Sequence, residues 1–149
     1  MHEINNHLLN LVENLGLELC FVDMKRSGFY FAEEKTIFLN NELLNENSDF
    51  EVSHELAHCI KKHEELSAYY NATGYSRRKL EFEANRIAIE ILLFIWSNEY
   101  DFDKEQLNAV KFMEYYKIPW SLERYVRESM RNLGLNCQIK CNTLLKKTS

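Results

Sequence analysis

The five residues His54-Glu55-Leu56-Ala57-His58 constrain the fold of this chain more than any other stretch. Side chains four positions apart lie on the same face of a helix, so a helix here places two imidazoles side by side. Two such histidines can bind one tetrahedral Zn²⁺, and the glutamate between them is then directed at a water molecule beside the metal. Because zinc lowers the pKa of such a water molecule to about 7, a carboxylate can take its proton at neutral pH. The motif therefore predicts a helix that carries part of a hydrolytic zinc site.

The surrounding sequence predicts the limits and faces of this helix. Ser48 and Glu51 have the spacing of a capping box, and the helical pattern continues to about Lys62. On a helical wheel His54 and His58 lie opposite an apolar face, which consists of Val52, Leu56, Cys59 and Ile60. The two histidines are therefore expected outside the core. The alternative is a solvated polar face that matches the motif by chance.

A third ligand is expected from the next long helix, about residues 78–96. Glu83, Arg86 and Glu90 gather on one side of this predicted helix, so Glu83 is expected to be solvated. Glu81 lies on the opposite side, on a stripe with Asn85, Ala88 and Leu92. Burial of a lone carboxylate is costly, and a metal ion would offset that cost. Two histidines and one glutamate with an open fourth position form a hydrolytic zinc site. The alternatives for Glu81 are a salt bridge to a buried arginine and a hydrogen-bonded carboxylate in the core.

Length and composition favour one helix-rich α+β domain. The 149 residues can bury a sizeable core, and 46% hydrophobic content with only 4 Gly and 1 Pro is typical of a helical globular chain. Residues 17–23 alternate like a strand, and residues 28–32 and 35–40 are typical of a hairpin. We therefore predict a small antiparallel sheet before the motif helix. A single domain is expected over residues 1–134, followed by a C-terminal tail over residues 135–149.

Two further segments precede the second long helix. The N-terminus is expected to form an amphipathic helix that ends at Gly16. Residues 63–77 lack clear periodicity and are expected to form an active-site loop or a disordered loop. One of the tyrosines in that segment could donate a hydrogen bond to the oxyanion of a reaction, and the sequence does not decide which. His63 is expected at the exposed end of the motif helix.

Two short helices are predicted after residue 96. Asp103 with Gln106 can cap the first, and Pro119 can open the second, which ends at Gly134. The side chains expected to face inward are Leu107, Val110, Met113, Leu122, Val126, Met130 and Leu133. Their spacing resembles a helix-turn-helix, but a helical hairpin that closes the core is favoured over a DNA-reading unit.

Charge and cysteine content restrict the partners. Residues 1–99 carry 9 basic and 17 acidic groups, within a net charge of −5 for the chain, and such an acidic body does not favour nucleic-acid binding. No apolar run is long enough for a bilayer and no signal peptide is recognisable, so we expect a cytoplasmic protein without a membrane partner. Cys20 and Cys59 are expected to be reduced structural thiols. Cys137 and Cys141 could pair or bind metal.

Four features of the chain form a recognisable set: the hairpin end Ile37-Phe38-Leu39-Asn40-Asn41, the motif HELAH, the block Glu81-x-x-Ala84-Asn85-x-x-Ala88 followed by Ile91-Leu92-Leu93, and the segment Tyr116-x-Ile118-x-x-Ser121. Together they resemble ImmA/IrrE-type metallopeptidases, over roughly residues 4–133. The resemblance implies a zincin-like fold and a gluzincin-like site, with His54, His58 and Glu81 as Zn²⁺ ligands and Glu55 as the general base.

The same resemblance implies a function. It is that of a cytoplasmic zinc endopeptidase of a mobile element or prophage, whose protein substrate is a helix-turn-helix transcriptional repressor. Cleavage of the repressor would relieve repression of the element's genes. One alternative is a non-catalytic antirepressor that sequesters a regulator. Another is a DNA-binding regulator that uses residues 103–133, which would bind duplex DNA in a salt-dependent manner.

Overall fold

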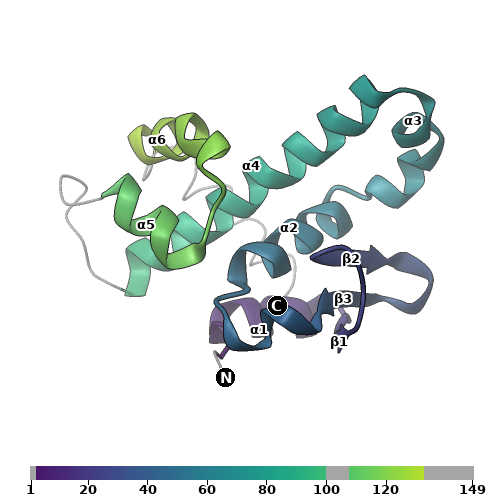
Figure 1. Cartoon of the computed structure of the whole chain (residues 1–149), viewed down its shortest axis with the longest axis horizontal. Helices are drawn as coiled ribbons and strands as arrows, with labels where there is room; N and C mark the ends of the chain where they lie inside the picture. The colour runs from purple at the N-terminus through teal and green to yellow at the C-terminus, as the bar shows by residue number, and fades with distance from the viewer. Residues whose placement is uncertain (1–2, 100–107, 133–149) are drawn as a thin grey trace.

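The computed structural model describes residues 3–99 and 108–132, which form a mostly helical α+β fold, as predicted (Figure 1). The helices are α1 (Asn6–Asn14), α2 (Asp49–Ile60), α3 (Ser67–Ala72), α4 (Gly74–Glu99), α5 (Ala109–Tyr116) and α6 (Glu123–Arg131). The strands are β1 (Glu18–Val22), β2 (Gly28–Phe31) and β3 (Thr36–Asn40). Short 3-10 helices are η1 (Ala32–Glu34), η2 (Asn41–Asn45), η3 (His63–Leu66) and η5 (Trp120–Leu122).

The three strands form one mixed sheet in the order β1–β3–β2. β2 pairs antiparallel with β3, from Gly28 opposite Leu39 to Phe31 opposite Thr36, which confirms the predicted hairpin. β1 runs parallel to β3, so the prediction of a purely antiparallel sheet is wrong. Side chains alternate between the two faces of a strand in both kinds of sheet, and alternation therefore cannot reveal strand direction.

Helix α2 lies between α4 and the sheet and carries much of the core (Figure 1). Val52 and Leu56 are fully buried, as expected from the helical wheel, whereas Cys59 and Ile60 are only partly buried. From the sheet, Ile37 and Leu39 contribute fully buried side chains to the same core. The opposite face of α2, which carries the two histidines of the motif, remains outside this core.

The first turn of α2 differs from the predicted capping box. Ser48 is the N-cap residue, as expected, but its side chain makes no capping hydrogen bond. The Asn47 side chain instead accepts the Asp49 backbone N–H at 3.0 Å. Glu51 therefore has no reciprocal role at the helix start, and its Oε2 atom is buried without a hydrogen-bond partner.

Residues 63–77 are helical, so the prediction of an irregular loop is wrong. They form η3, α3 and the first turn of α4, which begins at Gly74, before the expected start near residue 78. The side chain of Thr73 accepts the Ser76 backbone N–H at 3.0 Å, and the side chain of Ser76 accepts the Thr73 backbone N–H at 3.1 Å. This reciprocal cap starts α4 one turn early, and it uses serine where the usual pattern has Glu or Gln.

Helix α6 packs against α4, where the ring centroids of Phe82 and Tyr125 are 4.4 Å apart, and α5 packs against Trp96 near the end of α4. Together they close the core, as the hairpin interpretation predicted (Figure 1). Asn108 caps α5, because its side chain accepts the Lys111 backbone N–H at 3.1 Å. Met113 is buried as predicted, but Val110 is exposed. The other predicted inward residues of this region that are described are all buried at least in part, namely Leu122, Val126 and Met130. Asp103, Gln106, Leu107 and Leu133 lie outside the described residues.

Some predictions concern parts of the chain that the structure does not describe. The boundary between a domain at residues 1–134 and a tail at residues 135–149 stays a prediction, as do the roles of Cys137 and Cys141. Within the described residues, Cys20 and Cys59 are free thiols. No helix in this part of the chain is long and apolar enough to cross a bilayer.

Candidate metal centre

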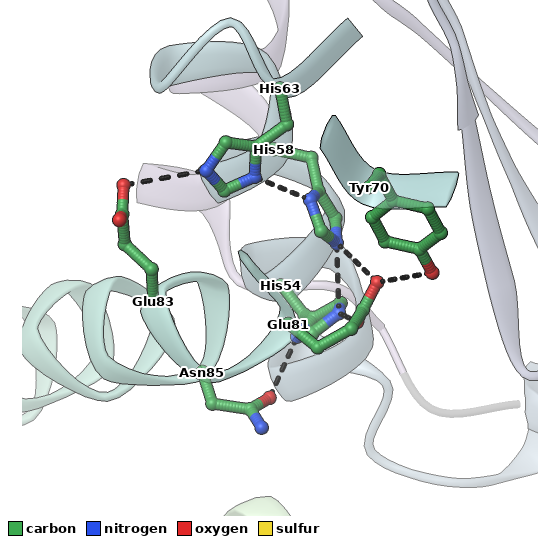
Figure 2. A network of polar contacts seen from close by, with 7 residues as sticks. All are labelled: His54, His58, His63, Tyr70, Glu81, Glu83 and Asn85. Carbon is green, nitrogen blue, oxygen red and sulfur yellow. Dashed lines mark hydrogen bonds and ion pairs between the residues drawn. The ribbon is translucent and has the colours of Figure 1, made fainter. Parts of the chain in front are cut away.

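The structure brings His54, His58 and Glu81 together between α2 and α4 (Figure 2). The Nε2 atoms of the two histidines are 3.1 Å apart. One carboxylate oxygen of Glu81 lies 2.9 Å from His54 Nε2, and the other lies 3.4 Å from His58 Nε2. The three side chains expected from the sequence as ligands therefore meet at one place, with the two carboxylate oxygens of Glu81 against the two Nε2 atoms.

The spacing of these atoms is close to that of a tetrahedral zinc site. Zn²⁺ holds histidine nitrogen and carboxylate oxygen atoms at about 2.0–2.2 Å, which places neighbouring ligand atoms roughly 3.3–3.5 Å apart. The observed separations of 2.9–3.4 Å are at or slightly below this range. His54, Glu55 and His58 alone also form a group whose ligand atoms lie within 4.8 Å of one another. These residues could hold one metal ion with only small side-chain shifts.

His54 is oriented by a residue of α4. Its Nδ1 atom lies 2.7 Å from the Asn85 side-chain oxygen, which can only accept a hydrogen bond. The Nδ1 atom therefore carries a hydrogen. Burial lowers the pKa of His54, but the hydrogen bond to Glu81 and the charges of Glu55 and Glu81 outweigh burial and raise it. Because the Glu81 carboxylate can only accept, the hydrogen of its 2.9 Å contact with His54 lies on Nε2, where a metal would bind, and metal binding would release it.

His58 is oriented by a residue that the sequence did not reveal. Its Nδ1 atom lies 2.8 Å from His63 Nδ1, and His63 Nε2 lies 3.3 Å from Glu83 Oε1. Both partners correct a prediction, since His63 is buried rather than exposed and Glu83 is paired rather than merely solvated. The cause is Lys62, whose left-handed backbone conformation (φ 53°) turns the chain back after α2 and lays His63 against His58.

Glu55 is held in a nearly buried position beside the two histidines. Its exposed fraction is only 8%, and burial raises its pKa although the nearby charges of His54 and His58 lower it. Gly28 leaves room for this position, because a Cβ atom there would lie 3.3 Å from Glu55 Cγ and would require a small shift of one of the two residues. A raised pKa makes a carboxylate a stronger base, which suits a group that must take up a proton.

Glu81 differs from Glu55 in its protonation. Burial raises the pKa of Glu81, but hydrogen bonds from His54 and His58 outweigh burial and hold the pKa far below its usual range. One of its carboxylate oxygens also accepts the Tyr70 hydroxyl at 3.0 Å. The low pKa keeps Glu81 ionised, the form that binds a metal, whereas burial favours the protonated form of Glu55.

Tyr70 is the tyrosine of residues 63–77 that reaches the site (Figure 2). Tyr69 and Tyr75 are exposed. Burial and the negative charge of Glu81 raise the pKa of Tyr70, which keeps its hydroxyl protonated and able to donate. Because the position depends on how α3 packs against α4, no local sequence signal distinguishes Tyr70 from its neighbours.

A cleft of about 1000 Å³ opens in front of these groups. The whole of β2 forms one side of it, and the lining on the other sides includes His54, Glu55, His58, Tyr70 and Glu81. The cleft therefore combines an edge strand of the sheet with the polar groups of α2 and α4.

A small sheet followed by an HExxH helix, with a glutamate on the next long helix, defines a zincin-like α+β fold. Residues 12–130 match the model of peptidase family M78, described as the IrrE N-terminal-like domain, and the chain belongs to this family. Neither a curated protein nor a solved structure matches this chain. The family match confirms the predicted resemblance to metallopeptidases of the ImmA/IrrE kind.

Proposed function

We propose that this protein is a zinc-dependent endopeptidase in which His54, His58 and Glu81 hold the metal. Glu55 acts as the general base. The observation that carries the proposal is the meeting of two Nε2 atoms and the Glu81 carboxylate within 3.4 Å, in a cleft that Glu55 also lines. Membership of a metallopeptidase family supports the same assignment.

The chemistry follows from the positions of these side chains. When bound, zinc supplies a Lewis acid that polarises the scissile carbonyl and lowers the pKa of water. Glu55 takes a proton from the attacking water as the new C–O bond forms, and then delivers that proton to the amine as the C–N bond breaks. The Tyr70 hydroxyl, which lies at the same side of the cleft as Glu81, is suited to donate to the oxyanion that develops on the carbonyl.

The position of the sheet edge supports the proposal that the substrate binds as an extended peptide. β2 is an outer strand, and the Ser27 carbonyl accepts the Asn40 backbone N–H at 2.9 Å. Since hydrogen-bonded and non-hydrogen-bonded pairs alternate along antiparallel strands, Gly28 and Tyr30 direct their backbone groups away from β3. That edge borders the cleft, where a peptide could add as a further strand, and the Tyr30 backbone on it is hydrogen-bonded to Glu55.

The substrate we propose is a helix-turn-helix transcriptional repressor, whose cleavage in the cytoplasm relieves repression of a mobile element or prophage. The support is the family relationship to ImmA/IrrE-type metallopeptidases. The competing proposal is an antirepressor that sequesters the regulator without cutting it. The two differ in whether Glu55 is required.

The test is incubation of the purified, zinc-loaded protein with the repressor encoded next to it, followed by mass spectrometry of the products. Wild type should yield two fragments, and Glu55→Gln should lower turnover by orders of magnitude while it keeps its zinc and its fold. Glu65→Gln is the matched control, because it makes the same charge change at an exposed site on η3. Release of intact repressor from its operator by wild type and Glu55→Gln alike would favour sequestration.

A further inference from the structure

We propose that His63 and Glu83 are positioning residues that fix the tautomer of His58 and so keep its Nε2 lone pair directed at the metal. The inference rests on the proposed metal site and adds a support that lies outside the HExxH motif and its glutamate. It concerns how tightly the site binds zinc, which can be measured without any substrate.

The contacts form a continuous chain (Figure 2). Glu83 Oε1 lies 3.3 Å from His63 Nε2, His63 Nδ1 lies 2.8 Å from His58 Nδ1, and His58 Nε2 faces His54 and Glu81. The His63 ring is buried, so water does not compete for its nitrogens. Each of its two nitrogens has one partner.

The hydrogen positions follow from what each partner can do. A carboxylate only accepts hydrogen bonds, so His63 Nε2 carries the hydrogen directed at Glu83. A neutral imidazole has a single N–H, which leaves His63 Nδ1 as an acceptor. The short contact between the two Nδ1 atoms must then be donated by His58. When zinc replaces the hydrogen that His58 Nε2 directs at Glu81, His58 keeps a single hydrogen, on Nδ1, and its Nε2 lone pair faces the metal.

A charged His63 would give the opposite result. It would donate from both nitrogens, His58 Nδ1 would have to accept, and His58 Nε2 would present a hydrogen instead of a lone pair. A metal at His58 Nε2 excludes that arrangement, because it needs the lone pair of that atom. Glu83 disfavours rotation of the His63 ring, because a flipped ring would lose its acceptor.

Helix α4 thus contributes the ligand Glu81 and also carries residues that orient both histidine ligands. Glu81 contacts both Nε2 atoms, Asn85 orients His54 directly, and Glu83 orients His58 through His63. Lys61 Nζ lies 3.7 Å from Glu83 Oε1 and balances the negative charge of that carboxylate. Groups of this kind typically change metal affinity by about 10–100-fold when they are removed.

The experiment measures the zinc affinity of the full chain by competition with a chromophoric chelator. His63→Leu keeps the bulk of the ring but removes the acceptor, and it should weaken zinc binding about 10–100-fold. His63→Asn should bind zinc more tightly than His63→Leu, since its amide oxygen can accept near the place of Nδ1. Glu65→Gln, on the same turn and exposed, should bind zinc like wild type.

A second measurement needs no variant. Long-range ¹H–¹⁵N spectra of the histidine rings in zinc-loaded wild type should show His63 protonated on Nε2 and His58 protonated on Nδ1. A hydrogen on His63 Nδ1 would overturn the proposal. So would unchanged zinc affinity in folded His63→Leu, or equal losses in His63→Leu and His63→Asn, which would indicate packing rather than an acceptor. If the wild-type protein binds no zinc, the proposed metal site itself is wrong.

Discussion

Glu51 and Glu55 lie one turn apart on α2, and both are at least partly buried, but only Glu55 has a proposed role in catalysis. Glu55 lies among two histidines and the backbone of β2, in the cleft. Glu51 has a buried Oε2 atom without a hydrogen-bond partner. Burial raises the pKa of Glu51. Its charge therefore lowers stability, because its own backbone N–H and the charge of His54 offset burial only in part.

The Glu51→Gln variant should be more stable than wild type at pH 7. A carboxyl group whose pKa is raised on folding costs stability above its unfolded pKa, near 4.3, and costs nothing below it. The gain should therefore disappear at about pH 3.5, where both chains carry a neutral side chain. Urea unfolding of the metal-free proteins at the two pH values measures this. Equal midpoints at pH 7 would contradict it.

At the scale of single residues, the sequence predicted what one helix alone determines. His54, Glu55 and His58 share a face because of helical spacing, and Glu81 could be separated from Glu83 by the side of α4 on which it lies. His63 could not be placed in this way. Its position depends on the left-handed turn at Lys62 and on two helices meeting, and neither leaves a periodic signal.

Among the elements, α1 and α5 end in the same way but with different residues. Gly16 ends α1 with φ 72°, and Lys117 ends α5 with φ 54°. In both, the N–H of the left-handed residue bonds three residues back and the next N–H bonds five residues back, which is the Schellman pattern. Glycine adopts this conformation without steric cost, whereas lysine does not.

The Gly16→Ala variant should lose about 1–2 kcal/mol of unfolding free energy. A Cβ atom at this position has nothing within 4 Å, so the loss comes from the backbone conformation alone and not from a clash. Lys117→Gly is the matched control, because it makes the reverse change at an equivalent position and should not destabilise the fold. Denaturant unfolding measures both. Wild-type stability in Gly16→Ala would show that α1 can end without a left-handed residue.

A comparison of the elements also shows which local sequence signals predicted helix ends and strand pairing correctly. Gly16 was a readable helix stop, and the β2–β3 hairpin was readable from alternation. The direction of β1 was not, because its partner is the central strand β3 and pairing direction depends on the path of the chain between them. The early start of α4 was missed because Thr73 and Ser76 form their cap without a glutamate.

For the whole molecule, the decisive contact is between α2 and α4. The chain reverses direction between these helices through η3 and α3, and the site lies across their contact (Figure 1). The α+β class and the closing helices α5 and α6 were predictable from composition and helical patterns. The pairing of α2 with α4 was predictable only through the chemistry of the site, since a metal with ligands at positions 54, 58 and 81 requires it.

Zinc should therefore stabilise the entire fold rather than one loop. Its ligands come from two helices, so the unfolded chain does not present the site, and binding adds about 4 kcal/mol when free zinc is 1,000 times the Kd. For a chain of this length that corresponds to a rise in Tm of roughly 8–16 °C. Without zinc, the contacts of Glu81 with His54 and His58 still hold the helices together, so the metal-free protein gives a measurable reference.

The measurement is Tm against zinc concentration, together with metal content after dialysis, which should be about one zinc per chain. Ala at His54, His58 or Glu81 should shift the rise in Tm to much higher zinc concentrations, because each change removes one of three ligands. Glu65→Gln should follow the wild-type curve. A wild-type Tm that does not respond to zinc would show that the site does not bind zinc. A Glu81→Ala curve that coincides with wild type would leave the site in place but show that its third ligand is another residue.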